Sequence, residues 1–136
     1  PDKSYAQGNG FGFVGGDTVD RGSDVKIEGT EDPAIYQTER YMMDSFVAEV
    51  PNGKYTVRLH FAETYDDITF DGPRVFDVKV QGAEAVKDLD IAKTVGLKKA
   101  LVKEVKSVEV SDGILKIQFV SKQQNPAING IEILGE

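Results

Sequence analysis

The sequence contains no cysteine and no tryptophan, and it has a single histidine. Without cysteine, disulfide bonds, thiolate chemistry and cysteine-ligated zinc are excluded. Without tryptophan, any stacking of a ligand on an aromatic ring falls to the five tyrosines and seven phenylalanines. No apolar run approaches the roughly 20 residues that a membrane-spanning helix needs, and no signal peptide opens the chain. We therefore expect an excised domain or a mature fragment, beginning at Pro1.

Positive charge is scarce as well. Sixteen lysines and arginines stand against 23 aspartates and glutamates, which gives a formal net charge of −7. This balance argues against nucleic acid and against an anionic membrane surface as partners. Neutral glycans and small polar ligands stay open. The 136 residues, 40% hydrophobic and 29% charged, predict one globular domain over residues 1–136.

The second half of the chain alternates between apolar and polar residues, as half-buried β-strands do. The alternating runs are Tyr55–Phe61, Phe76–Val80 and Leu115–Phe119, and Ile128, Ile131 and Ile133 indicate a closing C-terminal strand. The turn pairs between runs are Asn52-Gly53, Gln81-Gly82 and Asp112-Gly113. The first and last of these pairs are strong hairpin signals. Together, the runs and turns predict an all-β fold, an antiparallel β-sandwich.

Other segments are less regular. Between Ala100 and Val110 the apolar residues change parity, which predicts a β-bulge near Lys106-Ser107. The single helix candidate is Ile91 to Val95, ending at Gly96. The glycine-rich residues 1 to about 33 are expected to form loops with one or two short strands.

Several aromatic residues do not fit a core position. The run Ile35–Tyr41 keeps two tyrosines beside charged and amide side chains, so we expect one face of an extended segment there to meet something other than water. Tyr41, Tyr65 and Phe70 lie at expected strand ends or in a loop, near Arg40, Asp66 and Asp67. Aromatic faces beside polar groups suit a sugar-binding surface. The alternative is that these tyrosines seal the ends of the sandwich.

The sequence also contains candidate residues for a catalytic or a metal site. A glycosidase needs two carboxyl groups about 5–9.5 Å apart across a cleft. The candidate carboxylates are Glu39, Glu63, Asp66, Asp67 and Asp71, and solvated surface is the preferred interpretation of them. Calcium could be held by Asp17, Asp20 and Asp24, or by Asp66, Asp67 and Asp71, but neither set follows the EF-hand pattern. Local turn caps are the alternative, and no other cofactor is expected.

Two further motifs are interpreted as structural and not as parts of a catalytic or phosphate-binding site. His60 alternates with Thr56 and Arg58, which predicts a surface histidine on the polar face of a strand. The glycines between Gly8 and Gly16 lack the lysine that ends a phosphate-binding loop. They predict a backbone that approaches other groups closely, with Phe11 and Phe13 as anchors.

The order of several motifs resembles the malectin family, including the malectin-type carbohydrate-binding modules of bacterial glycoside hydrolases. The resemblance covers about residues 15 to 135. Its motifs are Gly15-Gly16-Asp17, Ile35–Tyr41, Phe61–Tyr65, Val75–Val78, Val86–Ile91, Asn125-Pro126 and Ile128–Ile133.

The resemblance implies a jelly-roll-like sandwich that binds carbohydrate without cleaving it. By motif position, Tyr41 and Tyr65 are the residues implied to stack on a sugar ring. This chain departs from the family at Asp66, where an aromatic residue is usual, and at Gln124, where an aspartate precedes the Asn-Pro pair. The family's early tyrosine has no match in Gly22–Thr30, and Phe11, Phe13 or Phe70 are candidates to replace it.

We therefore predict a non-catalytic module that binds an oligosaccharide or polysaccharide. Beside the two tyrosines, the residues expected to contact sugar hydroxyls are Arg40, Asp66, Asp67, Gln124 and Asn125, and Phe70 is expected at the same site as an aromatic residue. The expected setting is secreted or at the cell surface, bacterial extracellular or periplasmic, with a covalently linked polysaccharide-degrading domain. The alternatives are a malectin-like domain used for protein contact or domain packing, and a small hydrolase.

Overall fold

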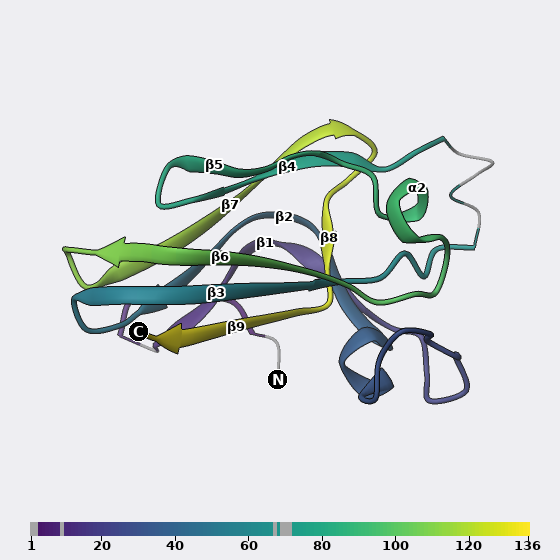
Figure 1. The fold of residues 1–136 in the computed structure, drawn as a ribbon, viewed down its shortest axis with the longest axis horizontal. Helices are drawn as coiled ribbons and strands as arrows, with labels where there is room; N and C mark the ends of the chain where they lie inside the picture. The colour runs from purple at the N-terminus through teal and green to yellow at the C-terminus, as the bar shows by residue number, and fades with distance from the viewer. Residues whose placement is uncertain (1–2, 9, 67, 69–71) are drawn as a thin grey trace.

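The computed structural model describes residues 3–8, 10–66, 68 and 72–136, and it is an all-β antiparallel sandwich (Figure 1). The larger sheet contains β1 (Phe11–Asp20), β2 (Thr38–Glu49), β7 (Ile114–Gln123), β4 (Val75–Val80) and β5 (Ala83–Leu89) in that order, and β8 (Ala127–Ile128) pairs with β2. The smaller sheet has the order β6 (Leu101–Val110), β3 (Gly53–Phe61) and β9 (Gly130–Gly135). The predicted fold class is confirmed.

The core lies between the two sheets and follows the alternation of the sequence. Val57, Leu59 and Phe61 of β3 have no exposed surface, and neither does Phe76 of β4. The rings of Phe61 and Phe76 meet at a centroid distance of 5.9 Å. Burying a side chain of this kind contributes about 1.5–3 kcal/mol, so the alternating residues bring the two sheets face to face.

The turn pairs connect strands differently from the prediction. Asn52-Gly53 leads from β2 to β3 and Asp112-Gly113 leads from β6 to β7, so both pairs cross between sheets and neither forms a hairpin. The two crossings contact each other, because Asn52 Oδ1 accepts a hydrogen bond from the Gly113 N–H at 2.8 Å. The hairpin is at Gln81-Gly82, between β4 and β5, where both residues have positive φ angles of 52° and 78°.

Two local predictions are confirmed. In the β3–β6 ladder, Tyr55 pairs with Val108 and Val57 with Val105, so Lys106 and Ser107 bulge opposite a single residue, and Ser107 has φ = 57°. The helix α2 runs from Ile91 to Val95. It begins where the Asp90 carboxylate accepts from the Lys93 N–H at 3.0 Å, and it ends at Gly96 with φ = 93°.

The first third is more ordered than expected. Instead of one or two short strands, β1 extends over ten residues and pairs along most of β2. The segment predicted to be extended over Ile35–Tyr41 is extended from Thr38 on, in β2, whereas its start belongs to a 3₁₀ helix, η1 (Pro33–Tyr36), and Tyr36 is buried. The predicted closing strand is divided in two at Asn129, with β8 in one sheet and β9 in the other. Within the described residues, no helix is long and apolar enough to cross a membrane.

A second bulge ties the β4–β5 hairpin to β7 through charged groups. The Asp77 carboxylate accepts from the Asp88 N–H at 2.7 Å, and Lys122 Nζ lies 3.5 Å from Asp77 and 2.6 Å from Asp88. The Asp88 backbone hydrogen bond lowers the pKa of Asp77 below its usual 3.8, and Lys122 lowers it further. The folded state thus binds the Asp77 proton more weakly than the unfolded chain does.

This arrangement predicts a pH dependence of stability. The contribution of ionised Asp77 is complete above about pH 5 and is lost as the pH falls below 3.8 toward the lowered pKa. Asp77→Asn should therefore flatten the loss of unfolding free energy between about pH 5 and pH 2, measured by urea titration. Asp24→Asn, at an exposed loop residue, serves as the control. Equal pH profiles for wild type and Asp77→Asn would contradict the prediction.

Candidate functional site

Tyr41 and Tyr65 line one cavity at the loop end of the sandwich, with a volume of about 310 Å³. Segments far apart in the sequence supply its walls: β1, β2, the residues after β3, those before β4 and the turn after β7. The lining residues are Val19, Arg21, Glu39, Tyr41, Tyr65, Arg74, Gln124 and Asn125. We call this space the Tyr41–Tyr65 cavity.

The structure brings together four of the predicted site residues. Tyr41 lies on β2, opposite Asp17 of β1 and Ala127 of β8, and its side chain is half-buried. Tyr65 is also half-buried, whereas Gln124 and Asn125 are exposed. Two rings and two amide side chains therefore share one cavity, as a surface for hydroxyl-rich ligands requires.

Two buried carboxylates at the cavity, Glu39 in its lining and Glu63 outside it, are each held by an arginine. Glu39 Oε1 accepts from Arg21 Nε and Nη2 at 3.2 and 3.1 Å, and from the Thr64 hydroxyl at 2.6 Å. Glu63, which is 1% exposed, accepts from Arg74 Nε at 2.8 Å. Such pairs are retained where the geometry satisfies both partners. Glu39 and Glu63 therefore support the cavity walls, and the surface interpretation of these two carboxylates is wrong.

The arginines of the cavity were not singled out from the sequence. Arg21 follows β1 and Arg74 precedes β4, so each lies far along the chain from its glutamate. A usable signal was the position of Glu39 and Glu63 inside motifs that adjoin core strands, because a buried carboxylate requires a cationic partner. This signal predicts that each glutamate has a cationic partner, but it does not identify which arginine or lysine that partner is.

Arg40 lies on the other side of β2. Its Nη1 donates to the carbonyl oxygens of Gly15 and Gly16 at 2.9 and 3.3 Å, and its guanidinium is 4.9 Å from the centre of the Phe13 ring. Arg40 was predicted to share the site with Tyr41, but it lies outside the lining of the Tyr41–Tyr65 cavity, so this predicted position is wrong. Successive side chains of a strand point to opposite faces, so the residue next to Tyr41 points away from the cavity.

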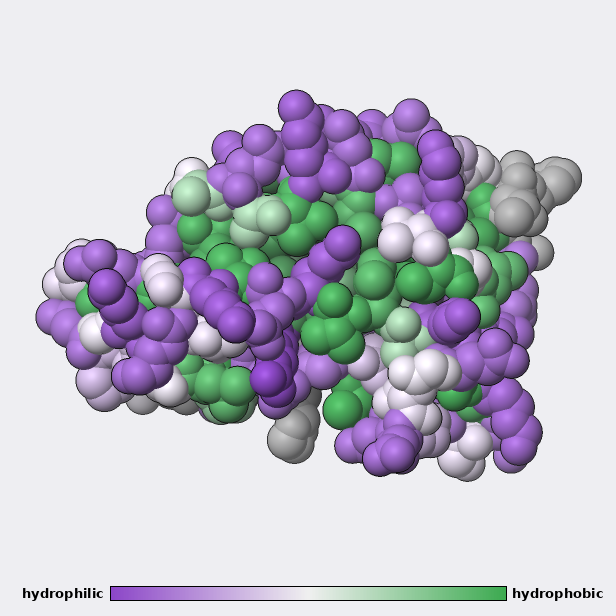
Figure 2. Space-filling model, in the orientation of Figure 1, coloured by the Kyte–Doolittle hydropathy of each residue, from purple (hydrophilic) through white to green (hydrophobic). Residues whose placement is uncertain are grey.

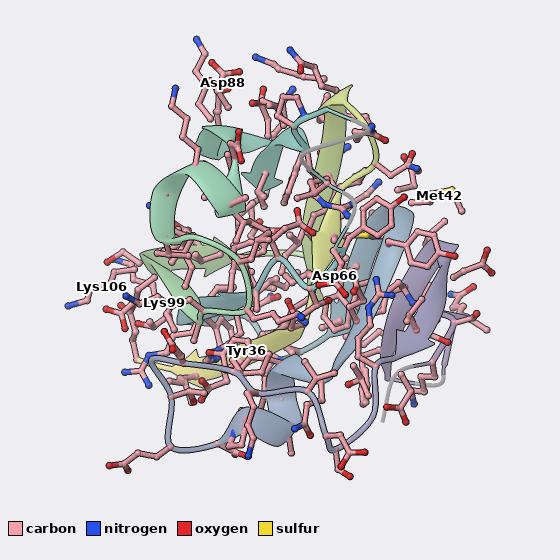
Figure 3. The ribbon with its side chains drawn as sticks, turned by 90° about the vertical axis from the view of Figure 1, so that its right-hand side faces the viewer. Tyr36, Met42, Asp66, Asp88, Lys99 and Lys106 are labelled. Atoms are coloured by element: carbon pink, nitrogen blue, oxygen red, sulfur yellow. The ribbon has the colours of Figure 1, made fainter. Side chains whose placement is uncertain are left out.

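Asp66 lies outside the lining of the Tyr41–Tyr65 cavity. Its carboxylate pairs with Lys98 Nζ at 2.8 Å, and this contact lowers the pKa of Asp66, with a smaller effect of Arg21. Figure 3 looks onto this end of the sandwich and shows Asp66 between Tyr36 and Met42. Asp67 and Phe70, also predicted at the site, lie outside the described residues.

His60 is buried, which corrects the prediction of a surface histidine. Its Nδ1 is 2.8 Å from the Tyr36 hydroxyl and its Nε2 is 2.6 Å from Glu132 Oε1. The side chain does lie on the polar side of β3, as its alternation indicated, but η1 covers that part of the sheet and brings Tyr36 against it. Tyr36 is thus an interior residue.

Among the described residues, no group of three or more histidine, aspartate or glutamate side chains is arranged to hold a metal ion. Of the second calcium set, Asp67 and Asp71 lie outside the described residues. Asp20 instead accepts from the Gly22 N–H at 2.8 Å, which is a local turn cap.

A second cavity of about 630 Å³ lies between the β1–β2 ribbon and the β8–β9 corner. Its walls include the rings of Phe11, Phe13 and Phe46, together with Ile35 and Arg40. Figure 2 shows an indentation beside the loop that carries η1, with hydrophobic side chains on its walls. Phe11 and Phe13 therefore face this apolar groove and not the Tyr41–Tyr65 cavity.

Comparison with known proteins gives consistent matches. Residues 2–131 match the family model described as "Malectin domain". Malectin-B of Xenopus laevis is 41% identical over 120 residues, which cover 76% of this chain and 43% of that protein. The kinesin-like protein KIN-14E of rice (Oryza sativa subsp. japonica) is 32% identical over 127 residues, covering 88% of this chain and 12% of that protein.

Among solved structures, the β-glucuronidase of Bacteroides uniformis superposes with a TM-score of 0.88 at 24% identity. The match covers 100% of this chain and 15% of that chain, and at this identity it shows the fold alone. The chain spans less than half of the length of each of these relatives.

Proposed function

Because the chain belongs to the malectin domain family, we propose that its Tyr41–Tyr65 cavity binds a glycan and does not cleave it. The observation that supports this most is the meeting of two half-buried tyrosine rings with the Gln124 and Asn125 side chains. Sugar rings have apolar faces that stack on aromatic rings, and their hydroxyls pair with amides in both directions.

The absence of cleavage is supported by the way the carboxylates at the cavity are held: Glu39 is part of its lining and Glu63 lies outside it. Glu63 is engaged by the guanidinium of Arg74, and Glu39 by that of Arg21 and by the hydroxyl of Thr64. A glycosidase acid or base has to reach the glycosidic oxygen or a water molecule beside the anomeric carbon. Carboxylates that are engaged by arginines in this way serve the shape of the cavity instead.

The proposal extends to the setting of the domain. A small open cavity binds weakly, and attachment to a polysaccharide-degrading enzyme would raise the effective concentration of substrate at the enzyme. The proposal rests on the motif resemblance to modules of bacterial glycoside hydrolases, and one part of a bacterial β-glucuronidase has the same fold. The expected place of action is secreted or at the cell surface, where polysaccharides are met.

The site is tested by removing its rings. Tyr41→Ala and Tyr65→Ala should each weaken binding of a glycan by at least about 2 kcal/mol, because aromatic anchors in a cavity dominate binding energy. A glycan array identifies a ligand for the wild-type protein, and titration calorimetry then measures the affinities. Tyr5→Ala is the matched control, since Tyr5 is half-buried, pairs with Glu49 and lies outside the cavity lining.

If the folded Tyr41→Ala and Tyr65→Ala variants bound the glycan as tightly as the wild-type protein, the glycan would bind outside this cavity. A wild-type protein that binds nothing on arrays of plant, algal and bacterial glycans would overturn the function itself. Release of reducing ends from a bound glycan would show an enzyme and contradict the non-catalytic part.

Protein contact is the alternative function, and the 630 Å³ groove favours it. The groove is walled by phenylalanine rings, and Phe11 keeps 42% of its surface exposed. Apolar surface of this kind often marks contact with another protein. If the Phe11→Asp variant lost a protein that copurifies with the wild-type domain but still bound the glycan, the groove would be a protein-contact surface.

A further inference from the structure

Arg74 connects two walls of the Tyr41–Tyr65 cavity. The residue is 7% exposed, and its Nε and Nη2 donate to the two carboxylate oxygens of Glu63 at 2.8 and 3.3 Å. Its Nη1 donates to the backbone carbonyl oxygen of Asn125 at 2.5 Å. One planar guanidinium therefore joins the segment after β3 to the turn after β7.

The segment that contains Glu63 and Tyr65 is anchored on its far side. The Glu63 carbonyl accepts from the Lys98 N–H at 2.8 Å, and Glu63 forms a β-bridge with Leu97. These contacts hold the Glu63 backbone in place, so its carboxylate accepts the Arg74 hydrogen bonds from a fixed position. Tyr65 follows two residues later, so the position of its ring depends on this support.

The opposite wall is a strained turn. Gln124 has φ = 56°, in the left-handed region that residues other than glycine avoid, and Asn125 precedes Pro126. Such a conformation persists only where its surroundings determine it. Arg74 holds the Asn125 carbonyl, and the Pro126 carbonyl accepts from the Met42 N–H at 3.0 Å, next to Tyr41.

We infer that Arg74 is a positioning residue, which holds Tyr65 and the Gln124-Asn125 turn in the spacing that a sugar ring requires. Its role toward a ligand rests on the glycan binding proposed above. A cavity whose walls are fixed before binding loses less conformational entropy on binding. Lysine carries the same charge but cannot donate to two carboxylate oxygens and a carbonyl in one plane.

The test compares Arg74→Lys with Arg40→Lys. Both arginines are buried, at 7% and 8% exposure, and both donate to backbone carbonyls, but Arg40 lies outside the cavity lining. Titration calorimetry uses the glycan that the array identifies for the wild-type protein, at a temperature where both variants are folded. Arg74→Lys should weaken binding at least tenfold, whereas Arg40→Lys should leave the affinity within twofold of wild type.

A mutant cycle separates positioning from direct contact. If Arg74 acts through the two walls, Arg74→Lys in a background that carries both Tyr65→Ala and Gln124→Ala should weaken binding less than threefold, because the side chains it positions are already gone. If Arg74 instead contacted the sugar, its effect would be as large in this background as in the wild-type protein, and the inference would be overturned.

Amide hydrogen exchange tests the connection even if no glycan is found. Arg74→Lys should speed exchange at least tenfold in residues 62–66 and 123–127, while Arg40→Lys should speed it around residues 14–17 instead. Wild-type exchange rates in both cavity segments of Arg74→Lys would overturn the inference, whatever the outcome for glycan binding. If exchange in Arg74→Lys were fast but no glycan were found for the wild-type protein, the structural role of Arg74 would be supported and only the proposed function would be contradicted.

Discussion

Replacing Glu63 with alanine should lower the free energy of unfolding by about 3–5 kcal/mol. The carboxylate is 1% exposed and neutralises Arg74, which is itself 7% exposed. Removing the carboxylate leaves a buried guanidinium without its counter-charge and without two of its hydrogen-bond acceptors. Single domains have about 5–15 kcal/mol of total stability, so this one change removes a large share of it.

Urea unfolding followed by far-ultraviolet circular dichroism measures the effect, since the chain has no tryptophan to report by fluorescence. Glu104→Ala is the matched control, because Glu104 also pairs with an arginine at 2.8 Å but in an exposed setting. We expect little change there, because solvent screens exposed ion pairs. Equal losses in the two variants would mean that burial does not set the strength of the Glu63–Arg74 pair.

Gly16→Ala should destabilise the domain by at least about 3 kcal/mol, from backbone strain and a steric clash together. Gly16 has φ = +87°, and a Cβ atom there would lie 2.5 Å from the Tyr41 carbonyl oxygen and 2.9 Å from the Met43 nitrogen. Both contacts are backbone atoms of the neighbouring strand, so no side chain can move away. The clash displaces β2 at Tyr41, and glycan affinity should fall along with stability.

Gly22→Ala separates strain from clash. Gly22 has φ = +91°, and a Cβ atom there would meet no atom within 4 Å. This variant should lose only about 1–2 kcal/mol, the cost of an unfavourable φ angle. If Gly16→Ala and Gly22→Ala were equally stable, the close approach of β1 to β2 would not be the reason for glycine at position 16.

Local features of the fold were predictable because they depend on neighbours in sequence. The alternation in Tyr55–Phe61 placed the core residues of β3, the change of parity located the bulge at Lys106-Ser107, and Asp90 and Gly96 delimit α2. The partner of each strand depends on distant residues. Asn52-Gly53 and Asp112-Gly113 encode sharp turns, but nothing in a turn pair says whether the next strand joins the same sheet.

The candidate site was predictable in part for a similar reason. The family resemblance located Tyr41, Tyr65, Gln124 and Asn125, which the fold collects from three separate segments. Sequence adjacency suggested Arg40, but the alternation of side chains along β2 turns it away from Tyr41. Arg21 and Arg74 were missed because their roles depend on glutamates 18 and 11 residues away along the chain.

The division of the last strands at Asn129 has a consequence for how the chain folds. β8 completes one sheet and β9 the other, so neither sheet is whole until residues 127–135 have been synthesised. β3 finds its partner β9 more than seventy residues later, at pairs such as Thr56 with Leu134. Pairing over such separations is slow, on the order of milliseconds to seconds. We therefore expect the two sheets to close together in one late step, after which the strands of both sheets are protected from proteases.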